Sequence, residues 1–174
     1  MSRRTRFWWC VIDRIKRRLT RFACLRKANM PGWEELEWIR AGEIFQGPEL
    51  EIPNRPGAYA VRCSSKGTPI PIARVFRRDT SGILFFGSTA IEAEGLRGRL
   101  KAFWRAVNGM AAPHAEGQRY HQAEYDNRGF PQNALEIGWR EFDAPPDAVA
   151  QELAWFDEYF CLFGELPPLN RRRG

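Results

Sequence analysis

Cysteine is scarce in this 174-residue chain, and the four cysteines that occur stand far apart. None belongs to a C-x-x-C pair, and there is no secretory apolar segment, which argues against a structural zinc site and a disulfide framework. The chain also lacks an apolar run long enough to cross a bilayer. These absences predict a cytoplasmic protein with reduced thiols. Its apolar fraction of 44% is enough to bury a core in one domain.

Acidic residues are nearly absent from residues 1–29, where ten lysines and arginines face Asp13 alone and give a net charge of +9. Residues 30–174 carry a net charge of −3, so the basic character of the chain belongs to this arm. Its apolar residues follow steps of three and four, which predicts a basic amphipathic helix. The stripe consists of Trp8, Val11, Ile12, Ile15, Leu19 and Phe22, and the candidate nucleic-acid contacts are Arg14, Lys16, Arg17, Arg18 and Arg21.

Several interpretations of this arm stay open. Such a helix could lie on nucleic acid, on an acidic membrane surface or on the domain that follows. Its arginine-rich, acid-poor composition also suits a presequence or a translation start upstream of Met30. A basic arm with no specific site is the simplest alternative.

Three strands are predicted in the remainder of the chain. Residues 82–89 form a short apolar run bounded by turn residues, which indicates a buried strand. Residues 58–63 alternate and should lie beside it, and residues 135–142 alternate in the same way. The connection between the first two strands is too long for a tight hairpin, and Ile70–Phe76 within it suits an extra edge strand.

Helices are predicted on both sides of these strands. Residues 30–54 suit a short helix around Trp33–Ile39 followed by a linker, and residues 96–107 show helical spacing after the central strand. Residues 108–132 are polar and are expected to form a long loop. The clearest helix starts at Pro145–Asp147 and stops at Gly164. The prediction is an α+β domain over residues 55–174, with a small, mainly antiparallel three-stranded sheet flanked by helices.

One carboxylate interrupts the apolar stripe of the last helix. Glu152 lies on the same face as Val149 and Phe156, where a buried charge is costly unless a cation or a donor meets it. Glu152 is therefore either a metal ligand or one half of a structural salt bridge.

Together these positions resemble the GIY-YIG nuclease domain over roughly residues 55–170. Gly57-Ala58-Tyr59 and Phe85-Phe86-Gly87 are similar to its two signature tripeptides, and residues 96–100 are similar to the helix that follows. The resemblance implies that Arg99 holds the scissile phosphate, that Tyr59 orients or deprotonates water, and that Glu152 binds Mg²⁺ or Mn²⁺. It also matches Asn170 to a terminal site residue, although Asn170 could instead cap the last turn.

Two departures from the family pattern fall on functional positions. Phe85 stands where the second signature tyrosine is expected, and Phe103 stands where many members carry histidine or tyrosine. Each keeps a ring and loses a polar group. Polar residues of the 108–132 segment, namely His114, Tyr120 and His121, could compensate by entering the site, or they could belong to an ordinary polar loop.

The sequence therefore favours a metal-dependent endonuclease for DNA, of a repair, restriction or mobile-element type, with RNA as a second candidate substrate. A catalytically impaired module that binds nucleic acid or a protein partner through the old cleft is the main alternative. A scaffold whose function lies in the amphipathic arm is a third hypothesis.

Overall fold

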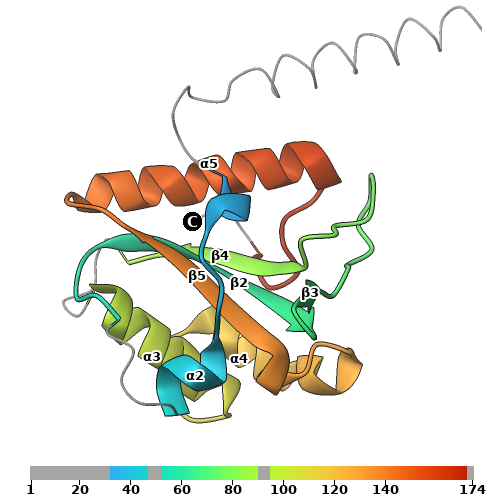
Figure 1. The fold of residues 1–174 in the computed structure, drawn as a ribbon, viewed down its shortest axis with the longest axis horizontal. Coiled ribbons are helices and arrows are strands. Elements are labelled where there is room, and N and C mark those ends of the chain that lie inside the picture. Colours follow the sequence, from blue (N-terminus) through green and yellow to red (C-terminus); the bar gives the residue numbers. More distant parts are fainter. Residues whose placement is uncertain (1–31, 47–51, 90–94, 172–174) are drawn as a thin grey trace, which may run out of the picture. The chain divides into compact units, whose positions relative to one another are not determined.

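The computed structural model describes residues 32–46, 52–89 and 95–171, which form a mixed α+β domain (Figure 1). A mainly antiparallel sheet is flanked by helices, as the sequence predicts. The elements, in chain order, are η1 (Trp33–Glu35), β1 (Ile39–Arg40), α2 (Ala41–Gln46), β2 (Gly57–Ser65), β3 (Thr68–Pro69), β4 (Ile83–Ser88), α3 (Gly95–Val107), α4 (Ala115–Gln122), η2 (Tyr125–Arg128), η3 (Gln132–Ala134), β5 (Leu135–Glu141) and α5 (Pro145–Phe163).

Strand β2 is the centre of the sheet, because it pairs antiparallel with β4 on one side and with β5 on the other. These are the three strands that the sequence predicts. Two short strands are additions: β1 pairs with β5, and β3 folds back on the end of β2. The β2–β3 turn uses Lys66 and Gly67, both with positive φ, so this connection does contain a tight hairpin.

The prediction of an edge strand over Ile70–Phe76 is wrong. A single bridge joins Ile72 to Asp79 and closes a loop between them. Pro69 and Pro71 have no backbone N–H to donate, which limits any longer ladder here. The result is a loop of six residues whose base is fixed by the bridge.

Alternation along β2 builds two cores, one on each face of the sheet. Tyr59, Val61 and Cys63 belong to the core that also contains apolar side chains of α3. Ala58 and Ala60 belong to the other core, with the aromatic residues of α5. Figure 1 shows α5 on one face of the sheet and α3 and α4 on the other. Tyr59 therefore faces the layer that contains α3 and α4.

The helix predicted at residues 96–107 is α3, and it buries Leu96, Leu100, Phe103 and Val107. The prediction that residues 108–132 form a long loop is wrong, because this segment contains the helices α4 and η2. His114 caps α4 by accepting a hydrogen bond from the backbone N–H of Gly117. Few aliphatic residues mark α4, so its helical pattern is hard to see in the sequence.

The prediction of a helix around Trp33–Ile39 is also wrong. Only the single turn η1 forms there, whereas Ile39 pairs with Ile137 as part of β1 and the helix α2 begins at Ala41. Apolar residues at Trp33, Leu36 and Ile39 fit a helical stripe and a buried turn leading into a strand equally well.

Helix α5 starts and stops where the sequence predicts, and it ends at Gly164 with φ of +79°. The chain then returns to the sheet and covers the free edge of β4. The backbone N–H of Leu169 donates to the Leu84 carbonyl at 2.9 Å. The side chain of Asn170 accepts from Phe86 N at 3.0 Å and donates to Phe86 O at 3.1 Å, as a neighbouring strand would.

The predicted basic arm, with Arg14, Lys16, Arg17, Arg18 and Arg21, lies outside the described residues. Within the part of the chain that the structure describes, none of the helices has the length and hydropathy needed to cross a membrane.

Candidate active site

A polar cluster forms where β2 and β4 lie side by side. In their register Tyr59 stands opposite Gly87. A Cβ atom at Gly87 would lie 2.5 Å from the Tyr59 hydroxyl, so only glycine lets the tyrosine lie across its neighbour. This contact gives a steric reason for a tyrosine and a glycine at these two positions.

The Tyr59 hydroxyl receives two hydrogen bonds. Arg99 of α3 donates from Nε at 3.1 Å, and His114 lies with Nε2 at 2.9 Å. Arg99 is held in turn by the Pro113 carbonyl, which accepts from Nη1 at 3.2 Å. Residues that are 15 to 55 positions apart in the sequence thus meet at one oxygen atom.

The proton of His114 can be assigned from its second ring nitrogen. The backbone N–H of Gly117 donates to Nδ1 at 3.1 Å, so Nδ1 carries no proton. The neutral ring then carries its proton on Nε2 and donates it to Tyr59. With two donors on its oxygen, Tyr59 must direct its own hydroxyl hydrogen away from both.

His114 is neutral in the folded protein. It has no exposed surface, and burial, together with the positive charge of Arg99, lowers the pKa of His114 from 6.5 to about 2. Burial has the opposite effect on the phenol, since it raises the pKa of Tyr59 above its usual value of 10.0. Tyr59 therefore keeps its hydroxyl proton at neutral pH.

The two phenylalanines that depart from the family pattern form the walls around His114. The Phe103 ring centroid lies 5.2 Å from that of His114, and the Phe85 centroid lies 5.6 Å away in an edge-on arrangement. Phe85 also meets Tyr59 edge-on at 5.8 Å. An imidazole from the segment after α3 thus occupies the space beside Phe85 and Phe103, the two positions where the resemblance would place a polar group.

Charged side chains of α4 and α5 surround this centre. Glu116 lies 2.6 Å from Arg119 and 3.8 Å from Arg99. Burial is the main cause that raises the pKa of Glu152, and Glu116 adds to it, whereas a hydrogen bond with Ser88 and the charge of Arg99 oppose it. These couplings associate the buried Glu152 with the same cluster as Tyr59.

The other candidates take different positions. The Tyr120 hydroxyl donates to the Phe130 carbonyl at 2.6 Å, within the core. His121 is exposed and lies against Gly109. The Asn170 side chain is hydrogen-bonded to the backbone of Phe86 at the edge of β4. Of the three polar residues of the 108–132 segment that were candidates to enter the site, the structure brings His114 to Tyr59 and places Tyr120 and His121 elsewhere.

Sequence reasoning missed Glu116, Arg119 and Ser88. Glu116 and Arg119 are spaced as an i,i+3 ion pair, a signal that was hidden because residues 108–132 were predicted to be a loop. Ser88 lies near the end of the predicted strand and is the last residue of β4, but only the fold shows that a residue from α5 would bind it.

Few side chains at this site could bind a divalent ion. Among the described residues, no three histidine, cysteine or carboxylate side chains gather as a metal-binding group. Glu152 offers one carboxylate whose charged form is disfavoured by burial, and a nearby cation would relieve that cost. This suits Mg²⁺, which keeps several of its waters and often uses one or two protein carboxylates.

Comparison with protein-family models finds no match, and comparisons with curated proteins and with solved structures find none that is significant.

Proposed function

We propose that this protein is a metal-dependent endonuclease that hydrolyses DNA phosphodiester bonds, and that it is a divergent GIY-YIG nuclease. The observation that carries the proposal is the Tyr59 hydroxyl, which is held by both Arg99 and His114 at 3.1 and 2.9 Å. The pairing of the two tripeptide strands and the coupling of Glu152 to the cluster give further support.

Arg99 binds the scissile phosphate in this proposal. Its guanidinium is oriented by Tyr59 and by the Pro113 carbonyl, and its side chain is 20% exposed. A fixed guanidinium stabilises the negative charge that grows on the phosphoryl oxygens in the transition state. Glu116 and Arg119 position Arg99 through their ion pairs.

Tyr59 acts first as a hydrogen-bond donor. Because its pKa is raised and its acceptor positions are filled, it offers its hydroxyl hydrogen to the attacking water or to a phosphate oxygen. That bond orients the water, whose oxygen bonds to phosphorus and whose proton passes to a phosphate oxygen while the bond to the leaving oxygen breaks. When Tyr59 instead gives its hydroxyl proton to the leaving alkoxide, the N–H groups of Arg99 and His114 stabilise the resulting phenolate.

Glu152 would hold the divalent ion. A bound Mg²⁺ or Mn²⁺ supplies positive charge that stabilises the leaving alkoxide. Glu152 contributes its carboxylate from α5, and Ser88 orients that carboxylate through their hydrogen bond.

The test is plasmid nicking by purified full-length protein with and without Mg²⁺ or Mn²⁺. We expect metal-dependent nicking, and we expect Glu152→Ala to lower its rate by roughly 10²-fold or more, as removal of one electrostatic stabiliser does. Glu158→Ala, on the same helix, is the matched control and should cut like the parent. Equal rates for the parent and Glu152→Ala would assign the activity to another site or to a contaminant.

A second candidate function is a binding module without hydrolysis, and the burial of the cluster favours it. Tyr59 and His114 have no exposed surface, both ring nitrogens of His114 are bonded within the protein, and the Tyr59 oxygen already accepts from two donors. A phosphodiester reaches the hydroxyl only if neighbouring groups move. Nucleic-acid binding by the intact fold, with no cleavage by the parent in any metal, would favour this module.

A further inference from the structure

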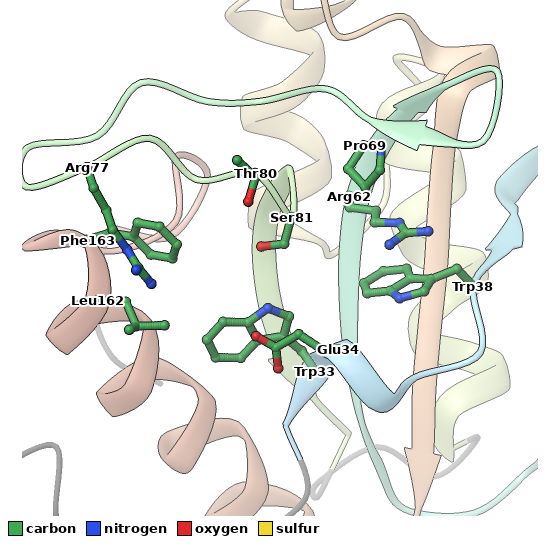
Figure 2. A pocket seen from close by; sticks show the side chains of 10 residues that line it. All are labelled: Trp33, Glu34, Trp38, Arg62, Pro69, Arg77, Thr80, Ser81, Leu162 and Phe163. Atoms are coloured by element: carbon green, nitrogen blue, oxygen red, sulfur yellow. The ribbon is translucent and has the colours of Figure 1, made fainter.

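A pocket lies toward the other end of the β2–β4 pair from Tyr59. It is lined by residues from η1, the end of the loop before β4 and the end of α5, and its volume is about 290 Å³ (Figure 2). Tyr59 pairs with Gly87 near one end of these strands, whereas Arg62 and Ser81 stand toward the other. The proposed nuclease site uses none of these pocket residues.

Trp33 lines this pocket with a donor that has no partner. The side chain is 1% exposed, and its Nε1–H makes no hydrogen bond to any part of the chain that the structure describes. An unsatisfied buried N–H costs roughly 1–3 kcal/mol, so it calls for an explanation. The ring is fixed by contacts with Phe86 at 5.3 Å and Tyr159 at 6.0 Å.

Figure 2 shows the nitrogen edge of Trp33 turned toward Ser81, among the side chains that line the pocket. The Ser81 hydroxyl donates to Asp79. A ligand with an acceptor atom in this space would satisfy the indole N–H.

Arginines with restricted positions line the same space. The Arg77 guanidinium lies over the Phe163 ring at 5.1 Å, and that of Arg62 lies over Trp38 at 4.2 Å while it binds Glu136. Stacking of this kind fixes the planar groups and leaves their edges for hydrogen bonds. The pocket therefore combines aromatic surface, cationic edges and a buried donor.

The loop beside the pocket carries a further aromatic ring and a further cationic side chain at the protein surface. It spans the residues between Ile72 and Asp79, and Phe76 at its tip is 57% exposed although its backbone N–H is bound to the Phe163 carbonyl at 3.1 Å. The ring rests on Gly164, so one of its faces is fixed against the protein. Exposed Arg78 adds a second cation next to Arg77.

The negative charge of Glu34 favours a nucleobase over a phosphate as the ligand of this pocket. This carboxylate also lines the pocket, and it would repel a bare phosphate there, but it can accept hydrogen bonds from the amino or imino groups of a base. A nucleobase is planar and carries donors and acceptors on its edge, while its phosphates remain outside for the arginines. Exposed aromatic rings between cationic groups are the usual design of single-strand binding surfaces.

We propose that this pocket binds one base of a single-stranded nucleic acid, with Trp33 Nε1–H donating to the base, Phe76 stacking on a neighbouring base and Arg77 and Arg78 binding flanking phosphates. This role is independent of hydrolysis at Tyr59. A free nucleotide shares the chemistry of the base, but it would lack the contacts made by Phe76 and Arg78.

The test follows the indole N–H signals of the full-length protein by ¹⁵N NMR, with EDTA present so that cleavage does not interfere. The chain has seven tryptophans, and Trp33→Phe assigns the signal if that variant folds. If it does not, exchange protection selects the buried indoles, which among the described residues are those of Trp33 and Trp155, and Trp155→Phe separates the two signals. The probes are a thymidine decamer, a decamer of abasic sites with the same phosphates, and thymidine monophosphate.

We expect the thymidine decamer to move the Trp33 signal downfield, the abasic decamer to leave it in place, and the mononucleotide to move it only at a concentration at least roughly tenfold higher. The double variant Arg77→Gln/Arg78→Gln should weaken the Trp33 response about tenfold or more, whereas Arg128→Gln should not change it. An unmoved Trp33 signal at saturating decamer, or an equal response to the abasic strand, would overturn the proposal.

Discussion

At the residue scale, the centre of the account is the oxygen of Tyr59. Its two partners, Arg99 and His114, are donors, so the phenol is held in one orientation and its own hydrogen is directed away from both. Of the two partners, only Arg99 follows from the resemblance. His114 reaches the same atom from a different segment, and it packs against Phe85 and Phe103, which stand where the resemblance would place polar residues.

The buried histidine makes a pH-dependent contribution to stability. The pKa of His114 is lowered from 6.5 to about 2 in the folded state, so below pH 6.5 the unfolded chain binds a proton that the folded chain does not. Stability is fully present above pH 6.5 and falls as the pH drops, by up to about 1.4 kcal/mol per pH unit. Urea unfolding between pH 7.5 and 5 measures this slope.

His114→Gln should flatten that slope even if it lowers stability at every pH. His121 is exposed and provides the matched control, and His121→Gln should keep the slope of the parent. Parallel pH profiles for the parent and His114→Gln would contradict a buried neutral imidazole.

Placing tyrosine at Phe85 or histidine at Phe103, as the resemblance would have it, should not raise the nicking rate. Phe85 and Phe103 are both fully buried and both contact the His114 ring. The added hydroxyl of Phe85→Tyr would crowd that ring, and Phe103→His would bury a second polar ring in an apolar space, each at a cost of roughly 1–3 kcal/mol. We expect lower stability and a nicking rate that stays flat or falls, measured side by side with the parent.

A higher nicking rate in either Phe85→Tyr or Phe103→His would instead indicate that the phenylalanine slows the reaction because it lacks a polar group. The complementary changes separate these cases. His114→Ala should reduce cleavage by about 10²-fold, within the range of a lost general acid–base or orienting group. Tyr120→Phe and His121→Ala should have little effect, because neither side chain reaches Tyr59.

At the scale of elements, the sequence predicts those helices and strands that depend on a local pattern of apolar, glycine and proline residues. Gly164 predicts the end of α5, and alternation predicts β2 and β5. The apolar stripe predicts only part of the buried face of α5, because Phe156 and Phe163 are buried whereas Leu153 and Phe160 are exposed. The sequence misplaces α4 because Ala115–Gln122 is polar and is held by tertiary contacts. The position of His114 depends on that helix, so its approach to Tyr59 could only be offered as one alternative.

The edge of β4 provides a prediction at the element scale. The Asn170 side chain satisfies both the N–H and the carbonyl of Phe86, and Asn170→Ala would remove both bonds. We expect the free energy of unfolding to fall by roughly 1–3 kcal/mol in urea titrations. Asn127→Ala, at an exposed position of η2, is the control. An unchanged midpoint for Asn170→Ala would show that this pairing contributes nothing to stability.

At the scale of the whole molecule, charge is separated along the chain. Residues 1–29 carry a net charge of +9, and residues 30–174 carry −3. In the proposed function, a segment of this kind would supply non-specific attraction for phosphates, and the described domain would supply the aromatic and polar side chains that contact bases and the scissile bond.

Deletion of residues 1–29 should therefore weaken DNA binding and reduce its dependence on salt, because fewer counterions are released. The slope of log affinity against log salt should fall by roughly 0.9 for each phosphate contact that is lost. Fluorescence anisotropy at several salt concentrations gives both slopes. The same slope with and without the arm would place the binding surface in residues 30–174 and favour membrane or partner docking for the arm.

The most direct test of the central claim is single-turnover DNA cleavage in Mg²⁺ by the parent, Tyr59→Phe and Tyr125→Phe. Each variant removes one hydroxyl, and circular dichroism establishes that each is folded. We expect Tyr59→Phe to cut roughly 10²–10⁴-fold more slowly, the range for loss of an orienting or acid–base group, and Tyr125→Phe to cut like the parent. Cleavage by folded Tyr59→Phe at the rate of the parent would contradict the claim that this hydroxyl is the centre of a hydrolytic site.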